Sequence, residues 1–396
     1  GVLERTLGVP IFQEQVMQLA IVAAGFSPGE ADSLRRAMAA WKKRGGLGPF
    51  RERLLNGMHA RGYAPEFAER LFEQICGFGD YGFPESHAAS FALLVYVSAW
   101  IKRHYPAVFV CALLNSQPMG FYAPAQLVRD ARAHGVDVRG VDVRFSDWDC
   151  TLEDDSDPST HPVLRLGMRM IHGFGIQPAQ RLCRTREQEG PFTDVADLAR
   201  RAELDRRSLR ALADAGALAG ISGHRRQAWW QILGIEARGP LLEPVPTTEP
   251  APDLSAPSEA EDLIGDYRGV GLSLGRHPLA LLRTRLRRHG YRPATELAQS
   301  GHRRIARGAG LVINRQRPGA AGGVVFLTLE DETGSLNVVI WKDLARRQRS
   351  LVVGARLLGV VGIWEQRGDV HHLVAGRLED YSHLLGELQT RSRDFH

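Results

Sequence analysis

Apolar residues recur with helical spacing through the first third of the chain. Residues 11–24 carry them at every third or fourth position, which predicts an amphipathic helix. The run Ser27-Pro28-Gly29-Glu30 supplies a capping serine, a proline for the first turn and a glutamate three residues after the serine, so a second helix should begin there. Residues 50–78 predict two further helices, broken at 62–65, and residues 124–134 predict another.

A long apolar segment runs from Ala88 to Trp100, between the turn-forming stretch Gly79–Glu85 and Pro106. Serine is a favoured N-cap, so Ser86 and His87 are expected at the start of this helix. The first N–H groups of a helix lack partners within it, which makes them a natural seat for a phosphate group. On spacing alone, an ordinary capped helix packed in the core also explains the segment.

Toward the end of the chain, short runs of alternating apolar and polar residues are separated by turn residues. This pattern predicts strands, and the positions are Gly310–Asn314, Val324–Leu329, Leu336–Trp341, Ala355–Trp364 and His371–Ala375. Short strands with a Thr333-Gly334 turn fit an OB barrel. The sequence therefore predicts a multidomain protein that is mainly α-helical and ends in a small all-β OB barrel.

A glycine–apolar–glycine sequence, Gly173-Phe174-Gly175, lies between two predicted helices and resembles the hairpin of a helix-hairpin-helix motif. Glycines let a hairpin backbone approach the sugar-phosphate chain closely, and its N–H groups can bind a phosphate. Such contact carries no sequence preference. The stretch from Leu204 to Leu218, which holds Arg206 and Arg207, resembles a weaker second copy. Taken alone, Gly-x-Gly is more often an ordinary turn, so the helical context carries this interpretation.

The distribution of charge is more informative than its total. The 396 residues include 50 Lys and Arg against 45 acidic residues, a net charge of +5. No acidic residue occurs from Leu297 to Leu329, where arginines accumulate, and the candidate DNA contacts in this basic region are Arg303, Arg304, Arg315 and Arg317. OB barrels bind single strands through a basic groove and stacking aromatics. Aromatic candidates are few here, so binding is expected to depend on charge more than on stacking.

Cysteine spacing and apolar runs exclude several classes of protein. The four cysteines are widely spaced with no C-x-x-C pair, which argues against a zinc site of the common spacings and against a disulfide framework. Their use suits a reducing cytoplasm. No apolar run reaches membrane-spanning length and no signal peptide opens the chain.

Three stretches in one order resemble the fingers of bacterial DNA polymerase III alpha subunits: Pro10–Met17, Glu30–Met38 and Gly79–Phe91. Within that family the similarity is to the error-prone, damage-response paralogue. Pro84-Glu85 stands where replicative members usually carry Asn-Lys, and Leu114–Tyr122 also resembles the error-prone branch. The resemblance extends over almost the whole chain.

The resemblance implies that the fingers hold the triphosphate of an incoming nucleotide. The nucleotide-binding residues implied by position are Arg35, Arg36, Lys42, Lys43, Ser86 and His87. Arginine suits this role because its planar, paired donors match phosphate oxygens. Without the resemblance, basic residues toward the end of a helix have another explanation, since they complement the helix dipole while staying in water.

Asp137 and Asp142 alternate with valines and invite comparison with the carboxylates that hold two metal ions in polymerases. The exposed face of a short strand explains this alternation better. In the family that the chain resembles, the metal-binding aspartates lie in the palm, which would precede Gly1. The resemblance thus implies Mg²⁺ in the complete polymerase, with ligands outside this chain. Read as a fragment, the chain is expected to hold no catalytic or metal-binding residue and to be inactive alone.

Motifs and composition together divide the chain into segments. Prolines and acidic residues crowd residues 238–260, which predicts a flexible or extended linker. The expected order begins with part of the fingers (1–160), a tandem helix-hairpin-helix region (161–235) and the linker (236–262). A helical connector (263–300), the OB fold (301–385) and a frayed tail (386–396) follow.

The expected function is that part of an error-prone, translesion DNA polymerase which contacts primer-template DNA and deoxynucleoside triphosphates in the bacterial cytoplasm. Replicative relatives carry a short sliding-clamp motif near the linker, and none is found here. Contact with the clamp is therefore expected to pass through accessory damage-response proteins. Two alternatives remain, a DNA-binding or assembly module without catalysis, and the corresponding part of a high-fidelity alpha subunit.

Overall fold

The computed structural model describes residues 1–44, 48–77, 84–119, 122–154, 162–235, 252–368, 370–388 and 393–395. Two compact units make up the chain, Gly1–His104 and Tyr105–His396. Residues 78–83 of the glycine-rich turn and residues 236–251 of the expected linker lie outside the described part. None of the described helices is both long enough and apolar enough to cross a membrane.

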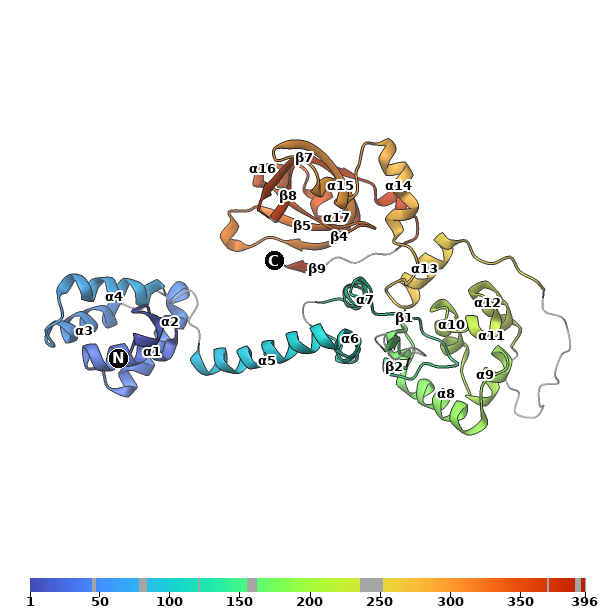
Figure 1. Ribbon diagram of the computed structural model, residues 1–396, viewed down its shortest axis with the longest axis horizontal. Coiled ribbons are helices and arrows are strands. Elements are labelled where there is room, and N and C mark those ends of the chain that lie inside the picture. The colour runs from blue at the N-terminus through green and yellow to red at the C-terminus, as the bar shows by residue number, and fades with distance from the viewer. Residues whose placement is uncertain are drawn as a thin grey trace. The chain divides into compact units, whose positions relative to one another are not determined.

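Four helices of the first unit pack around one apolar core (Figure 1, blue). They are α1 (Gln13–Ala24), α2 (Pro28–Arg44), α3 (Gly48–His59) and α4 (Pro65–Gly77), after a short 3-10 helix at Glu4–Thr6. Each helix contributes a side chain with at most 1% of its surface exposed, namely Val16, Leu34, Leu54 and Ile75. The helices expected from apolar spacing are therefore present.

The predicted capping box at the start of α2 is confirmed. The Glu30 carboxylate accepts a hydrogen bond from the Ser27 N–H at 2.7 Å, and Ser27 Oγ accepts one from the Glu30 N–H at 3.3 Å. The two bonds satisfy donors that the start of a helix leaves unpaired. The bonds from Ser27 also lower the pKa of Glu30.

The apolar segment after the glycine-rich turn forms helix α5 (Glu85–His104), but none of its residues is buried. Apolar side chains occur on all sides of this helix, and Tyr96 is 71% exposed. Helix α5 is therefore not packed in a core, which differs from the interpretation that spacing alone allowed. The physical reason is that α1 to α4 fill their core with their own side chains.

The second unit begins with α6 (Pro106–Asn115) and α7 (Pro124–Ala133), which share one apolar core with the helices that follow. Those helices are α8 (Ile176–Glu189), α9 (Val195–Arg201), α10 (Arg206–Asp214), α11 (Ala219–Ser222) and α12 (Arg225–Gly234). The shared core extends across residue 160, where the sequence indicates a domain boundary.

A small sheet lies between α7 and α8 in the sequence. Its strands are β1 (Val138–Arg139), β2 (Thr151–Glu153) and β3 (Val163–Arg165). Strand β3 is central, parallel to β1 and antiparallel to β2. The sheet leads through a 3-10 helix, Met168–Met170, to the glycine hairpin before α8, so it sets the position of that hairpin.

Three connector helices precede the barrel: α13 (Glu259–Gly269), α14 (Pro278–Arg288) and α15 (Ala294–Ala298). Arg225 at the start of α12 fixes α13, because its guanidinium lies 2.5 Å from Asp262 Oδ1 and 2.6 Å from Asp266 Oδ1. Leucines of α13 and α14 share a second apolar cluster with the barrel strands.

The barrel strands are β4 (Arg304–Gln316), β5 (Val325–Glu330), β6 (Ser335–Ile340), β7 (Leu357–Arg367) and β8 (Val370–Asp380) (Figure 1, orange to red). The sheet order is β5-β6-β8-β7-β4, and β4 also pairs with β5, which closes the barrel. Helices α16 (Lys342–Arg347) and α17 (Arg349–Gly354) connect β6 to β7. The predicted fold class, helical modules followed by an OB barrel, is confirmed.

The expected frayed tail contains a short strand, β9 (Arg393–Phe395), so that expectation needs correction. Strand β9 runs parallel to β4 at Asn314–Gln316. Strand β7 pairs with β4 only as far as Leu311. Strand β9 therefore pairs with a part of β4 that β7 does not reach.

Candidate nucleic-acid interface

The arginine pair expected to bind a triphosphate lies in the middle of α2 and shares one carboxylate. Arg35 Nη2 is 2.9 Å from Asp32 Oδ1, and Arg36 Nη2 is 3.2 Å from Asp32 Oδ2. The two arginine side chains are 39% and 67% exposed, so Arg36 is the more accessible to a phosphate. The side chains of Lys42 and Lys43 lie outside the described part of the chain.

Helix α5 begins at Glu85, two residues earlier than a Ser86 N-cap predicts, so Ser86 is not its N-cap. Ser86 and His87 are exposed in the first turn, and the His87 ring lies 4.3 Å from the Phe91 ring. The Glu85 N–H donates to Glu14 Oε2 at 2.9 Å. A carboxylate from α1 thus takes one of the donors expected to face a phosphate, since the start of a helix favours negative charge.

The glycine hairpin before α8 exposes both glycines. Gly173 has a φ of +76°, a conformation that glycine adopts without strain, and Gly175 is the residue before α8. Phe174 between them is buried, with 6% of its surface exposed. The His172 N–H donates to the Gly269 carbonyl at 2.8 Å, which ties the hairpin to the end of α13. Gly173 and Gly175 are therefore presented outward on a fixed backbone.

In the segment expected to be a second helix-hairpin-helix copy, Asp205 is the N-cap of α10. Its Oδ1 accepts a hydrogen bond from the Ser208 N–H at 2.8 Å, and the hydrogen bonds with Ser208 lower the pKa of Asp205. Arg206 and Arg207 follow in the first turn and are exposed. Arg206 Nη2 donates to the Ile235 carbonyl at 3.3 Å, and Arg207 is exposed in the same turn.

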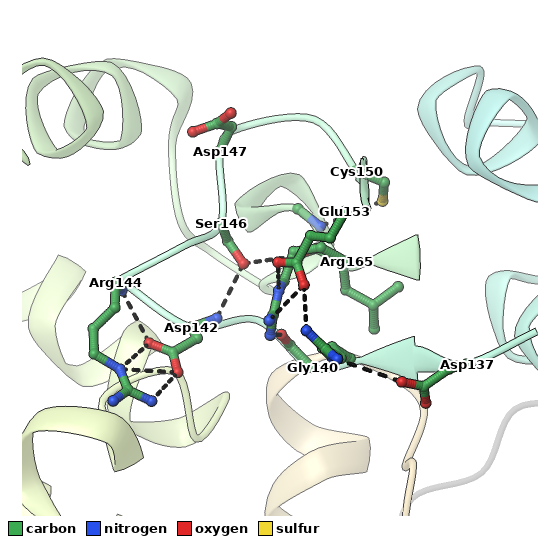
Figure 2. A network of polar contacts seen from close by, with 12 residues as sticks. Asp137, Gly140, Asp142, Arg144, Ser146, Asp147, Cys150, Glu153 and Arg165 are labelled. Atoms are coloured by element: carbon green, nitrogen blue, oxygen red, sulfur yellow. Dashed lines mark hydrogen bonds and ion pairs between the residues drawn. The ribbon is translucent and has the colours of Figure 1, made fainter. Parts of the chain in front are cut away.

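A network around Arg165 fixes the small sheet that leads to the hairpin (Figure 2). Arg165 Nε donates to Glu153 Oε1 at 2.6 Å, and its Nη1 donates to the Gly140 carbonyl at 2.9 Å. Arg139 Nη1 lies 2.8 Å from Glu153 Oε2. Hydrogen bonds from Arg165, with its charge and that of Arg139, lower the pKa of Glu153. Two arginines thus share one carboxylate and hold the strands together.

Asp137 and Asp142 do not fit a Mg²⁺ site. Figure 2 shows their carboxylates turned toward different arginines. Asp142 Oδ2 lies 2.8 Å from Arg144 Nη2, and Asp137 Oδ2 lies 3.6 Å from Arg139 Nε. Among the described residues, no group of three or more His, Cys, Asp or Glu side chains is placed to hold a metal ion. No chemical step is therefore assigned to these carboxylates.

The barrel arginines differ in their environment. Arg303, Arg304 and Arg317 are exposed, at the beginning of β4 and just beyond its end. Arg315 is partly buried instead, and donates from Nε to the Val352 carbonyl at 2.8 Å and from Nη2 to the Ala355 carbonyl at 2.6 Å. Arg315 therefore holds α17 against β4, while the other three are available to phosphates.

Outward polar side chains on the barrel were missed by the sequence reasoning. Asn314, Asn337 and His372 line one hollow on the outer surface together with Phe326. The alternation of buried and exposed residues in β6 and β8 carries this information, since residues two apart share a face. The candidate DNA contacts expected on the barrel were all arginines, so these polar positions were not among them.

Comparison with known proteins identifies three modules in the order in which the structure presents them. Residues 1–62 match the bacterial DNA polymerase III alpha subunit finger domain. Residues 135–228 match the helix-hairpin-helix motif, and residues 309–381 match an OB-fold nucleic acid binding domain. The chain belongs to the family of bacterial DNA polymerase III alpha subunits.

Relatives that match the whole chain carry the name error-prone DNA polymerase. Identity is 65% over 396 residues with the protein of Alkalilimnicola ehrlichii, covering 100% of this chain and 38% of that protein. A second relative, from an Azoarcus species, is 59% identical over 399 residues, which cover 100% of this chain and 37% of that protein. The chain therefore spans well under half the length of these curated relatives, and the expected resemblance is confirmed along all of it.

Proposed function

We propose that this chain is the part of an error-prone DNA-directed DNA polymerase alpha subunit that contacts the incoming deoxynucleoside triphosphate and the primer-template DNA. The observation that carries the proposal is the 65% identity with an error-prone DNA polymerase across all 396 residues. Finger, helix-hairpin-helix and OB modules in the same chain support it.

Arg35 and Arg36 would bind the triphosphate, because two guanidinium groups lie side by side on α2 and both are solvent-accessible. Ser86 and His87, exposed in the first turn of α5, would lie beside the same nucleotide. Lys42 and Lys43 remain expected contributors. Mg²⁺ would supply charge stabilisation to the transferring phosphoryl group from carboxylates elsewhere in the polymerase.

DNA contact would come from two regions. The exposed glycines of the hairpin before α8, with Arg206 and Arg207, would bind the sugar-phosphate backbone without sequence preference. The exposed barrel arginines would bind the phosphates of a single strand. Both contacts are electrostatic, so they should weaken as salt concentration rises.

The test is fluorescence anisotropy of this chain with a labelled primer-template that carries a single-stranded overhang, repeated across a salt series. We expect the logarithm of the association constant K to fall linearly with the logarithm of the salt concentration. The slope should be about −0.9 for each duplex phosphate contacted. A folded chain that binds no DNA at low salt would contradict the proposal.

Activity on damaged templates belongs to the same proposal. We expect the complete polymerase with this sequence to extend a primer past an abasic template position, in a bacterial cytoplasm and with accessory damage-response proteins joining it to the sliding clamp. We expect no extension from this chain alone, since it matches only 38% of the relative's length. Strict arrest of the complete polymerase at the lesion would favour a high-fidelity alpha subunit, and direct capture of the clamp by this chain would remove the accessory proteins from the proposal.

A further inference from the structure

The start of helix α5 is attached to the first unit by polar contacts. The Glu85 N–H donates a hydrogen bond to Glu14 Oε2 at 2.9 Å, although the two residues are 71 positions apart in the sequence. Arg5 Nη2 lies 2.9 Å from the carboxylate oxygen Oε1 of Glu85. None of the residues of α5 is buried, so apolar packing does not hold this helix. Its attachment therefore depends on polar contacts at its first residue.

The two contacts differ in strength. The Arg5 side chain is 78% exposed, and an ion pair in water contributes little because solvent screens the charges. Glu14 is half-buried, and its hydrogen bond is charge-assisted, which places it among the stronger hydrogen bonds of proteins. The start of a helix also favours a negative charge. Glu14 is therefore expected to hold the first turn of α5 more firmly than Arg5 does.

Buried Gln15, next to Glu14, fixes the segment that leads into α1. Its Oε1 accepts hydrogen bonds from the Ile11 N–H at 2.9 Å and the Phe12 N–H at 3.1 Å. Its Nε2 donates to Thr6 Oγ1 at 2.9 Å. Gln15 is only 3% exposed, so these bonds are made away from water. The first turn of α1, from which Glu14 reaches α5, thus has a fixed backbone.

The first turn of α5 carries two of the residues proposed to contact the nucleotide. Ser86 and His87 directly follow the first residue of the helix and are exposed. Helix α1 shares one apolar core with α2, the helix that carries the arginine pair proposed to bind the triphosphate. Glu14 on α1 therefore connects the two helices that carry the proposed nucleotide contacts.

Glu14 also makes the start of α5 a poor seat for a phosphate group. Its carboxylate already accepts the hydrogen bond of the Glu85 N–H, and a phosphate there would meet a like charge. The nucleotide is therefore expected to meet the side chains of Ser86 and His87 instead of the first backbone donor of the helix.

We propose that Glu14 is a positioning residue for nucleotide binding, which holds the first turn of α5 so that Ser86 and His87 face the same nucleotide as the arginine pair of α2. The inference rests on the proposed function and adds to it a residue that acts through others. Glu14 contacts the backbone of α5, and the effect of its loss would reach the nucleotide through Ser86 and His87.

The first test measures the contact in the 396-residue chain itself. Hydrogen exchange followed by mass spectrometry, on peptides that cover the start of α5, reports how firmly its first turn is held. Glu14→Ala removes the acceptor and should speed exchange there several-fold. Glu14→Gln keeps an oxygen acceptor and should retain most of the protection. Circular dichroism shows whether each variant is folded, and unchanged exchange in folded Glu14→Ala would overturn the inference.

The second test measures single-nucleotide insertion by the complete polymerase that carries this sequence. Glu14→Ala should raise the KM for deoxynucleotides about tenfold with kcat nearly unchanged, because binding is lost equally in the ground state and the transition state. Arg5→Ala should raise KM by less than about twofold, as expected for an exposed ion pair. The control Glu73→Ala removes an exposed carboxylate of α4 and should change neither constant.

A combined variant distinguishes positioning from a general effect on stability. Ser86→Ala together with His87→Ala should raise KM, and adding Glu14→Ala should raise it no further, because Glu14 acts through those two side chains. A further rise would overturn the inference, since Glu14 would then act by another route. A fall in kcat without a change in KM in Glu14→Ala would also overturn it.

The outcomes separate this inference from the function on which it rests. If Ser86→Ala together with His87→Ala raises KM and Glu14→Ala does not, only the positioning role is overturned. If the combined Ser86 and His87 variant keeps the parent KM, those side chains do not bind the nucleotide. That part of the proposed function then fails, and the positioning role fails with it.

Discussion

Arg283 and Asp331 form a buried ion pair that joins α14 to the turn between β5 and β6, with Nη2 and Oδ2 3.1 Å apart. Their side chains are only 10% and 4% exposed. Arg283 Nη2 also donates to Glu332 Oε2 at 2.7 Å. The Asp331 carboxylate accepts hydrogen bonds from the Ala294 N–H at 2.8 Å and the Gly334 N–H at 3.0 Å. One carboxylate therefore fixes α14, α15 and a barrel hairpin together.

Arg283→Ala should lower the free energy of unfolding of the barrel region by about 3 kcal/mol, because it leaves buried acidic groups without their partner. Chemical denaturation followed by tryptophan fluorescence measures the loss. Arg285→Ala, at an exposed position of the same helix, is the matched control and should change stability by less than about 0.5 kcal/mol. If the two variants were equally stable, the buried pair would have no structural importance.

His277 gives the same junction a dependence on pH. Burial lowers its pKa from 6.5 to about 4, although Glu332 and Asp331 nearby act in the opposite direction. The folded state thus binds fewer protons than the unfolded state between those values, and stability should fall as pH falls through that window. The total loss from this group is on the order of 3 kcal/mol, at about 1.4 kcal/mol for each pH unit.

His277→Asn tests this expectation. Asparagine is a good N-cap and can replace the imidazole nitrogen that accepts a hydrogen bond from the Leu279 N–H at 3.2 Å. Unfolding free energies measured from pH 7 to pH 4 should decline less steeply in this variant than in the parent. The same substitution at exposed His134 should leave the parent profile unchanged. Identical profiles for parent and His277→Asn would place the acid sensitivity elsewhere.

Secondary structure was largely predictable because its signals are local. The capping box at Ser27 and Glu30 and the strand alternation around Thr333-Gly334 depend on neighbours in the sequence, and both are observed. The start of α5 was placed wrongly because Glu14, distant in sequence, accepts the hydrogen bond of the Glu85 N–H. A tertiary partner of that kind leaves no trace in local propensity.

Candidate contacts were predictable by residue type but not by environment. Arg303 and Arg315 look alike in the sequence, yet Arg303 is exposed and Arg315 is bound to the carbonyls of Val352 and Ala355. The hollow lined by Asn314, Asn337 and His372 depends on strand register, which a sequence does not reveal until the pairing of strands is known. Roles that depend on long-range contacts therefore needed the structure.

Asp205→Ala should destabilise the region around α10 by about 1 kcal/mol, because it removes the acceptor that satisfies the Ser208 N–H at the start of α10. Asp205→Asn retains an acceptor and should cost only a few tenths of that amount. Thermal unfolding measured by circular dichroism compares the two variants. Equal destabilisation would mean that the charge of Asp205, rather than its hydrogen bond, stabilises this region.

Arg303→Ala and Arg315→Ala should have different consequences. Arg303 is exposed, so its removal should reduce the slope of log K against log salt by about 0.7 for single-stranded DNA while stability is unchanged. Arg315→Ala should lower the unfolding temperature and leave the slope unchanged, since its guanidinium already binds carbonyl oxygens of α17. The reverse pattern would assign Arg315 to the DNA and Arg303 to the fold.

Asp32 provides a test of the proposed triphosphate site. Its carboxylate lies 2.9 Å from Arg35 Nη2 and 3.2 Å from Arg36 Nη2, so it competes with any phosphate for both guanidinium groups. In the polymerase that carries this sequence, Arg36→Ala should raise the KM for deoxynucleotides roughly tenfold, as expected when a charge-assisted hydrogen bond is lost. Asp32→Asn should lower KM, because it removes the competing charge and keeps the shape of the side chain.

The matched control is Arg70→Ala, which removes an exposed arginine of α4 whose Nε donates to its own helix, at the Glu66 carbonyl. It should leave KM unchanged. Single-nucleotide insertion on a defined primer-template measures KM and kcat for all three variants. A KM that rises in Asp32→Asn would show that Asp32 orients the arginines instead of competing with the nucleotide. Unchanged kinetics in both Asp32→Asn and Arg36→Ala would remove this arginine pair from the nucleotide site.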